Sequence, residues 1–283
     1  MRPLPTRAAS LLIGSATVLA GTVLTPPAHA TSTAPLARKS AVNRHLSDGR
    51  IVESSGLARS TYARPLLWTH NDSGDSARVF AVDPATGDTV GVTHWSEHPV
   101  DTEALAPGGP GHVWVGDIGD NGWDRDHVTV YRFREPRSLK SGAGRATAYD
   151  FTYPDGPRDA EALLVRPDNG RVFIVSKDDN GGAVYRAPRR LSTSTVNKLQ
   201  RVTDAPATVT GGTFAPDGKS LVLVNYTRAY TYAGIGGAAQ SDTSKVNNSA
   251  QGESVEISRD GRRMFLGQEG SDSPVYAVPY SAP

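Results

Sequence analysis

The chain carries five copies of one pattern of polar and apolar positions. In each copy an acidic or polar pair leads into a short apolar run, then a turn sequence, then a second apolar run. The copies begin at residues 53, 101, 159, 210 and 251, a spacing near the ~40–50 residues of a propeller blade. Turn sequences such as Ala-Pro-Asp-Gly at 215–218 join the first two runs of a copy as a hairpin.

Further apolar runs, rich in Val, Leu, Trp, Tyr and Phe, predict the remaining strands of each blade. Second strands are predicted at 66–70, 112–116, 172–176, 220–224 and 264–267, and third strands at 78–82, 128–132, 183–186, 229–232 and 275–278. Fourth strands are predicted at 89–95, 147–153 and 200–203, whereas 234–250 predicts a long loop with a degenerate outer strand. The fold class is therefore all-β, a single five-bladed β-propeller of four-stranded antiparallel blades.

The two ends of the chain predict how the ring closes. The last copy leaves room for about three strands before residue 283, and segment 34–52 precedes the first copy without another role. We expect this N-terminal segment to supply the missing strand of the last blade. Such closure removes an exposed sheet edge, which would otherwise invite aggregation.

Residues 1–30 have the pattern of a secretory signal peptide. Arg2 and Arg7 precede an apolar stretch at 8–24, and Ala28-His-Ala30 has the form of a cleavage site. The stretch is interrupted by Ser, Thr and Gly, so we expect a secreted, extracellular protein without a membrane anchor, with the propeller domain at 31–283. The chain has no cysteine, so its stability must come from packing or from a bound ion.

The charge of the chain is nearly balanced. There are 30 Lys and Arg residues against 29 Asp and Glu, a formal net charge of +1. No strongly basic segment stands out, so we expect no nucleic-acid partner and a monomeric protein.

The aligned copies predict a polar ring in the central channel. Residues two apart on a strand share a face, and one face of each innermost strand borders the channel. The alignment places Ser55, Glu103, Glu161, Gly212 and Glu253 in one ring and Thr210 with Gln251 in the ring two residues earlier. Six carboxylates are predicted to converge and hold a metal ion, namely Glu53, Asp101, Glu103, Asp159, Glu161 and Glu253.

So many carboxylates need protons or a cation to remain close together. A hard divalent ion is favoured, and Ca²⁺ tolerates the irregular coordination of such a ring, whereas a site without Cys or clustered His disfavours zinc. The alternative is that these acids face neighbouring blades or pair with arginine in a purely structural role. A channel ion is itself as consistent with a structural role as with a catalytic one.

Polar loops are predicted at the same end of the channel as the acidic ring, because connections alternate ends in an up-and-down sheet. The candidate ligand-binding residues on them are Asp72, Asp75, Asp117, Asp120, Asn121, Asp178, Tyr226 and Glu269. His70, Lys177 and Arg228 accompany them and are the candidate catalytic residues that would stabilise charge on a substrate. The alternative is that Asn, Asp and Gly serve here as turn formers.

The motifs Trp68-Thr-His-Asn-Asp-Ser-Gly-Asp75, Val115-Gly-Asp-Ile-Gly-Asp-Asn121 and Gln251-Gly-Glu-Ser-Val255 carry a resemblance. With Glu53-Ser-Ser-Gly-Leu and the motif at 153–163, they resemble a family of secreted bacterial β-propellers described as WD-repeat-like or phytase-like. The resemblance covers nearly the whole of 31–283 and implies the fold more than the function, although the predicted strands do not end in the Trp-Asp dipeptides of WD repeats. More distantly, the acidic channel is similar to that of calcium-dependent phytase and nucleotidase propellers, in which calcium helps to hold phosphate.

Three functions are consistent with these patterns. The first is a secreted calcium-dependent hydrolase of anionic esters, most simply phosphoesters. The second is a non-enzymatic module that binds a cell-wall, carbohydrate or protein partner and has a structural channel ion. The third is a glycoside hydrolase with paired channel carboxylates. The predicted partner is accordingly a small anionic molecule or an extracellular polymer.

Overall fold

The computed structural model describes residues 41–62, 65–139, 141–237, 239–244 and 252–283. Chain contacts divide the sequence into residues 1–37 and residues 38–283, and every described residue belongs to the second unit. The predicted signal peptide at 1–30 lies outside the described residues. None of the described residues belongs to a helix of the length and hydropathy that a membrane span requires.

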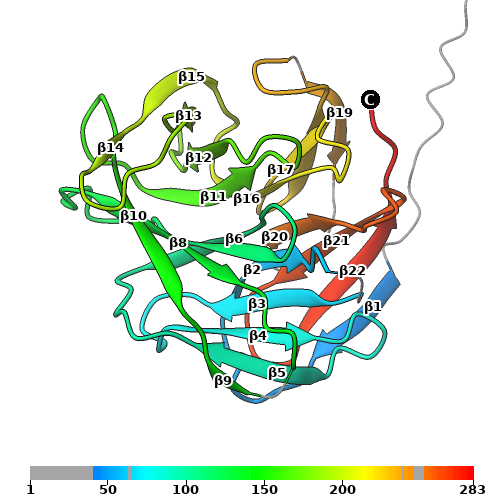
Figure 1. Ribbon diagram of the computed structural model, residues 1–283. Coiled ribbons are helices and arrows are strands. Elements are labelled where there is room, and N and C mark those ends of the chain that lie inside the picture. The colour runs from blue at the N-terminus through cyan, green and yellow to red at the C-terminus, as the bar shows by residue number, and fades with distance from the viewer. Residues whose placement is uncertain (1–40, 63–64, 140, 238, 245–251) are drawn as a thin grey trace, which may run out of the picture. The chain divides into compact units, whose positions relative to one another are not determined.

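Five small sheets form a ring around a central channel, which confirms the five-bladed β-propeller (Figure 1). The innermost strand of each blade is the first apolar run of each sequence copy, and each lies against the innermost strands of both neighbouring blades. These strands are β2 (Ser54–Arg59), β6 (Thr102–Pro107), β11 (Ala160–Val165), β16 (Val209–Phe214) and β20 (Gly252–Ile257). We call the face on which they begin the mouth face and the opposite one the far face.

The second and third strands follow outward in chain order. The second strands are β3 (Leu67–Asn71), β7 (His112–Asp117), β12 (Val172–Ser176), β17 (Leu221–Asn225) and β21 (Arg263–Gln268). The third strands are β4 (Arg78–Val82), β8 (Val128–Arg134), β13 (Ala183–Arg186), β18 (Arg228–Tyr232) and β22 (Ser273–Pro279). All ten runs were predicted from the apolar pattern.

The outer strands differ partly from the prediction. They are β5 (Thr89–His94), β10 (Ala146–Thr152), β15 (Gln200–Asp204) and β19 (Ala239–Ser244), the last within the segment predicted as a loop with a degenerate strand. Two short strands, β9 (Gly142–Ala143) and β14 (Asn197–Lys198), pair in parallel with β5 and β10. The blades of β2 and β6 therefore have five strands, and their sheets are not wholly antiparallel as predicted.

The N-terminal strand β1 (Ala41–Leu46) closes the ring. It pairs antiparallel with β22, from Ala41 opposite Ala277 to Leu46 opposite Ser273. The Leu46 side chain is fully buried and packs in the apolar cluster that contains Leu57 and Val275. The predicted closure is thus confirmed. The backbone of β1 pairs with the last blade, and the Leu46 side chain packs against the first.

The apolar core lies between neighbouring blades. The Trp68 ring of β3 meets the Phe133 ring of β8 edge to face, with centroids 6.1 Å apart. Strands β3 and β12 are buried along their whole length, because a blade covers each side of them. β12 accordingly has the nearly continuous apolar sequence Val-Phe-Ile-Val-Ser rather than an alternating pattern. This packing fixes the angle between blades and so fixes the width of the channel.

Candidate metal centre at the channel mouth

A β-bulge at the mouth end of every innermost strand sets the direction of the channel side chains. In all five blades the pairing between first and second strands skips one residue. The skipped residues are Ser55, Glu103, Glu161, Thr210 and Glu253. A bulged residue leaves the hydrogen-bond ladder, and its side chain is re-aimed. The bulges therefore aim four of these side chains, Ser55, Glu103, Glu161 and Glu253, at the channel.

In the fourth blade the bulge lies two residues before the predicted ring position, although Gly212 lines the channel cavity as predicted. The bulged residue there is Thr210, and Gly212 lies two residues deeper, opposite Leu223. Gly212 thus takes the place that Leu57 has in the first blade, where Leu57 lies opposite Thr69. The Thr210 hydroxyl donates to the carbonyl of Gly252 at 2.6 Å. Thr210 is not among the residues that line the channel cavity, and the fourth blade borders that cavity with Gly211 and Gly212.

The ring encloses a small cavity on the channel axis. Ser55, Glu103, Glu161 and Glu253 all line it, and its volume is about 10 Å³. This is room for roughly one water molecule or one ion. The Ser55 hydroxyl lies 3.3 Å from Glu103 Oε2, which ties the first two blades together across the ring. The cavity is too small to hold an organic substrate.

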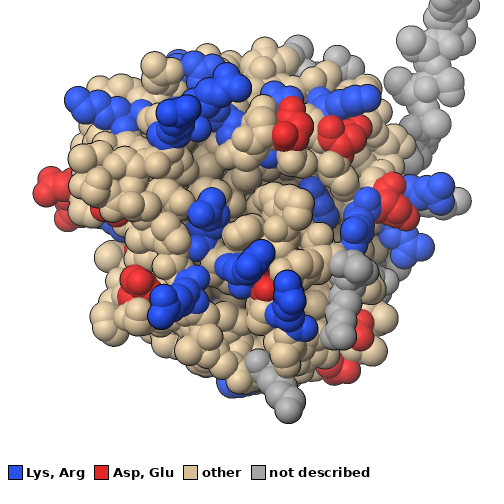
Figure 2. All heavy atoms as spheres, in the orientation of Figure 1, with Lys and Arg blue, Asp and Glu red and all other residues tan. Residues whose placement is uncertain are grey.

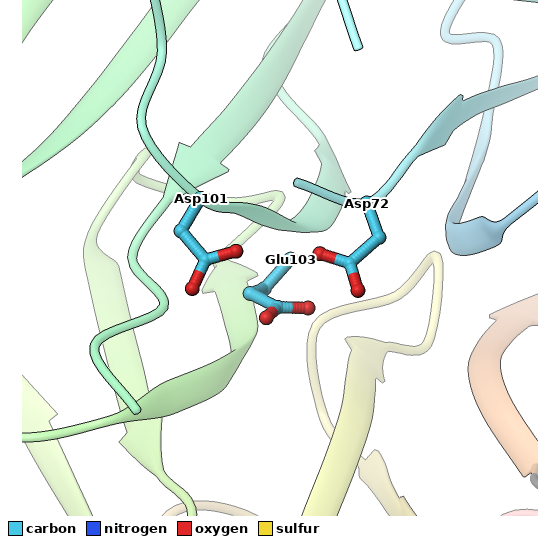
Figure 3. A group of neighbouring side chains, drawn as sticks. All are labelled: Asp72, Asp101 and Glu103. Carbon is cyan, nitrogen blue, oxygen red and sulfur yellow. The ribbon is translucent and has the colours of Figure 1, made fainter. Parts of the chain in front are cut away.

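Three carboxylates converge at the mouth of this channel, as Figure 3 shows. Asp72 follows β3, Asp101 precedes β6, and Glu103 is the bulged residue of β6. One oxygen of each lies within 4.8 Å of the others. We call these three residues the acidic triad. Glu103 is buried, while Asp72 and Asp101 are half-buried, so the triad faces both the channel and the solvent.

Backbone contacts hold the triad in place. The amide of Asp72 donates to the carbonyl of Glu53 at 2.9 Å, and the amide of Asp101 donates to Asp117 Oδ1 at 2.9 Å. Gly119 packs directly against the triad, because a Cβ at this position would lie 2.3 Å from Asp101 Oδ2. Any larger residue at 119 would displace the carboxylate of Asp101.

Burial and mutual repulsion disfavour ionisation of the cluster. Burial raises the pKa of Glu103 well above its usual range, and the nearby Glu161 adds to this effect. Burial and the neighbouring Asp72 raise the pKa of Asp101 to about 6. Burial and Glu161 raise the pKa of Glu253 to about 8. Without a cation, the cluster therefore holds protons at neutral pH.

The donor set fits a hard divalent cation. Every side chain of the triad offers oxygen, the ligand that Ca²⁺ and Mg²⁺ prefer. Glu161 lines the channel cavity, and its Oε2 atom is buried without a hydrogen-bond partner among the described residues. This atom is a further oxygen that could coordinate a cation. The irregular positions of the triad suit Ca²⁺ better than Mg²⁺, which demands near-ideal octahedral geometry.

A lysine neutralises one side of the ring. Lys177 Nζ forms an ion pair with Glu161 Oε1 and lies 5.4 Å from the centre of the Tyr226 ring. Burial alone would lower the pKa of Lys177, but the Glu161 carboxylate outweighs it and raises this pKa above its usual value. Lys177, predicted as a catalytic residue, is therefore a cation built into the ring.

His70 and Arg228, the other two predicted catalytic residues, lie apart from the triad. His70 is 1% exposed, its Nδ1 lies 2.6 Å from the carbonyl of Asn71, and its Nε2 has no partner among the described residues. Burial lowers the pKa of this imidazole, so the ring is neutral at neutral pH. Arg228 is exposed at the start of β18, beside Tyr226 and Gln268 in a small surface hollow. Neither side chain lines the channel cavity.

The remaining predicted metal ligands divide into two groups. Glu161 and Glu253 line the channel cavity, as predicted. Glu53 is exposed and contacts the triad through its backbone carbonyl, which accepts from Asp72. Asp159 is buried, and its Oδ1 accepts from the amide of Asp120 at 2.9 Å.

Most predicted ligand-binding residues outside the triad hold the mouth loops in shape. Asp117 pairs with Arg125 at 3.0 Å, and Asp75 pairs with Arg78 at 2.7 Å. The Asp178 carboxylate accepts from the amide of Asn180, and Asp120 accepts from the amide of Asp124. Asn121 is exposed, while Tyr226 and Glu269 are half-buried at the rim. Burial, followed by Asp72, raises the pKa of Glu269.

Asn71 is a structural residue of the site that the sequence analysis did not single out. Its Oδ1 accepts from the amides of Val52 and Glu53, at 3.0 and 3.2 Å. Its Nδ2 donates to Asp75 Oδ2 and to the carbonyl of Arg50, both at 2.8 Å. One buried amide thus joins two mouth loops beside Asp72. The signal in the sequence was its position at the end of β3, directly before an acidic residue.

No protein-family model matches the chain, and no curated protein matches it either. The fold and the acidic triad therefore define the class of protein at the level of a five-bladed β-propeller with a candidate metal site.

Proposed function

We propose that this chain is a calcium-binding β-propeller of the WD-repeat-like or phytase-like kind, secreted from the cell, which hydrolyses phosphoesters at its mouth face. The observation that carries the proposal is the acidic triad. Its oxygens lie within 4.8 Å of one another, at the entrance of a channel whose own carboxylates are short of compensating charge. A bound calcium ion would supply a positive charge for an anionic ligand and polarise its phosphoryl oxygen.

Different residues would hold the ion and bind the anionic ligand. Asp72, Asp101 and Glu103 hold the ion, while Gly119 and Asp117 keep Asp101 in position. Arg228 is exposed on the mouth face, where a guanidinium group suits the recognition of phosphate. Lys177 balances Glu161 and keeps the net charge of the ring low enough for an anion to approach.

A second candidate function is a non-enzymatic binding module with the same ion. It is favoured by the surroundings of the predicted catalytic residues, because Lys177 is paired with Glu161 and His70 is buried. In this function the calcium ion orders the mouth loops, and the mouth face binds an extracellular partner directly.

Calcium titration by calorimetry and thermal unfolding tests the ion itself. A ligand that binds only the folded state adds about 2.7 kcal/mol to the free energy of unfolding at a hundredfold excess over Kd. We expect this gain in the natural protein and in Asp179→Asn, a control that removes an exposed mouth-face carboxylate outside the triad. Asp101→Asn and Glu103→Gln should lose it. Equal melting temperatures in calcium and in chelator for the natural protein would refute the calcium site.

A panel of phosphoesters, assayed with and without calcium, separates the two functions. Hydrolysis that needs calcium and falls in Arg228→Ala, while calcium still stabilises that variant, would support the enzyme. A calcium-loaded protein that hydrolyses none of the panel would leave the binding module as the function.

A further inference from the structure

Charge is segregated between the two faces, although the whole chain has a formal net charge of only +1. On the mouth face, acidic side chains dominate the connections, as in the triad and in Asp124, Asp126 and Asp179. On the far face, the connections of the second to fifth blades carry exposed basic side chains. These include Arg137, Arg145, Arg189, Lys219, Arg259 and Arg262.

The exposed basic side chains of the far face outnumber its exposed acidic ones, which include Asp88 and Asp217. Asp168 pairs with Arg166 at 3.2 Å, and Asp260 accepts from the Ser258 hydroxyl and the Arg262 amide. Within the part of the chain that the structure describes, Arg137 and Lys219 form no ion pair with an acidic side chain. Figure 2 shows one face on which Lys and Arg gather over the centre with few Asp or Glu between them.

The far-face turns form one continuous surface. Arg259 Nη1 donates to the carbonyl of Tyr62, which joins the turns of the fifth and first blades. Arg166 Nη2 lies 3.4 Å from the carbonyl of Gly218, which joins the turns of the third and fourth blades. The basic side chains therefore project from a common base, distributed around the ring rather than along one groove.

We propose that the far face docks on the anionic surface of a phospholipid bilayer. A planar surface of negative headgroups can meet basic side chains on several blades at once, whereas a linear polymer would reach only some of them. Lys and Arg near an anionic bilayer each favour binding, and the effect falls off within a Debye length. Trp123, which is 45% exposed and is the one exposed aromatic residue among those that the structure describes, lies on the mouth face, so docking depends on charge and not on aromatic insertion.

Docking in this orientation gives the two faces separate roles. The acidic mouth repels the same surface that the basic far face attracts, so the charge asymmetry orients the protein as it approaches. The acidic triad then opens away from the bilayer, toward soluble ligands. This attachment is reversible and needs no spanning segment.

Sedimentation with lipid vesicles tests the proposal. The purified protein should bind vesicles of equal parts phosphatidylglycerol and phosphatidylcholine, and should release them as salt rises from about 0.1 to about 1 M. It should not bind pure phosphatidylcholine. The combined variant Arg137→Gln, Lys219→Gln and Arg262→Gln should bind about 100-fold more weakly, because each charge contributes roughly fivefold.

A matched control removes the same charge from the mouth face. Arg50→Gln, Arg78→Gln and Arg158→Gln together should leave vesicle binding within about twofold, since these residues face away from the lipid. Equal binding by the far-face variant and the natural protein would overturn the proposal, as would equal losses in both variants. If soluble linear polyphosphate binds more tightly per phosphate than the vesicles do, the proposal that the partner is a planar bilayer is wrong. Circular dichroism confirms that both variants remain folded.

Discussion

Arg59 and Glu256 form a buried ion pair that joins the first and last blades at the far end of the channel. Arg59 Nη1 contacts Glu256 Oε1, and the Arg59 amide donates to Glu256 Oε2 at 2.9 Å. The Thr213 hydroxyl and the Ile257 amide complete the shell around this carboxylate, at 3.1 and 2.7 Å. Glu256 is fully buried, so the pair depends on these contacts to offset the cost of desolvation.

Removing Arg59 should therefore destabilise the ring strongly. Arg59→Met leaves the Glu256 carboxylate buried without its cation, and we expect a loss of about 3–5 kcal/mol in the free energy of unfolding. Urea unfolding measures it. Arg50→Met is the control, because its partner Asp48 belongs to an exposed pair whose loss costs about 1 kcal/mol or less. Similar losses in both variants would show that the Arg59–Glu256 pair contributes no more to the free energy of unfolding than the Arg50–Asp48 pair.

The N-terminal strand should be essential for a stable ring. Leu46→Ala opens a cavity in the cluster between the first and last blades, and we expect a loss of about 2–5 kcal/mol. Deleting residues 31–50 should lower the melting temperature further and expose the edge of β22. Thermal unfolding and light scattering follow both effects. A truncated chain that melts like the intact one would show that closure by β1 does not stabilise the fold.

The sequence predicted the blades because each is built from apolar runs punctuated by turns, and packing between blades requires those runs. It did not predict the position of the fourth bulge because Thr210-Gly-Gly-Thr213 carries no acidic marker, and a bulge adds one residue without a signal of its own. His70 was predicted as a catalytic residue, but its side chain is buried. β3 is buried on both sides, so its sequence does not alternate and does not reveal which side chains face the mouth.

The metal candidates show the same division between local and long-range information. Glu103, Glu161 and Glu253 were predicted to lie together from the repeat alone, and the structure places all three at one cavity. Asp72 was predicted as a ligand-binding residue but not as part of the metal set. Its approach to Asp101 depends on the contact between two blades, which the spacing of residues along the chain does not encode.

Replacing Lys177 should make the fold more dependent on calcium. Lys177→Met leaves Glu161 without its ion-pair partner, so the protein in chelator should lose about 3 kcal/mol of stability. The same change increases the negative charge of the ring and should tighten calcium binding. Calorimetry and urea unfolding measure the two effects. Lys219→Met is a control on the far face, and it should change neither quantity.

Stability without calcium should fall as the pH rises. Burial and Glu161 raise the pKa of Glu253 from 4.5 in the unfolded chain to about 8 in the folded protein. The folded state then keeps a proton that the unfolded state has lost, so the free energy of unfolding decreases from about pH 4.5 to about pH 8. Melting temperatures in chelator measure this slope. Glu253→Gln should reduce this slope without abolishing it, because the raised pKa values of Asp101 and Glu103 give slopes of the same sign. A slope unchanged by that substitution would rule out Glu253 as a source.

The bulged side chains of the channel can be exchanged without altering the scaffold. Each bulged residue is outside the hydrogen-bond ladder, so its side chain can be exchanged without breaking a strand pair or disturbing the apolar packing between blades. Ser55 is the neutral one of the four bulged residues that line the cavity, and Ser55→Asp would add a carboxylate there. The charge of the cavity, and with it the choice of ion, can therefore be changed at four positions independently of the scaffold.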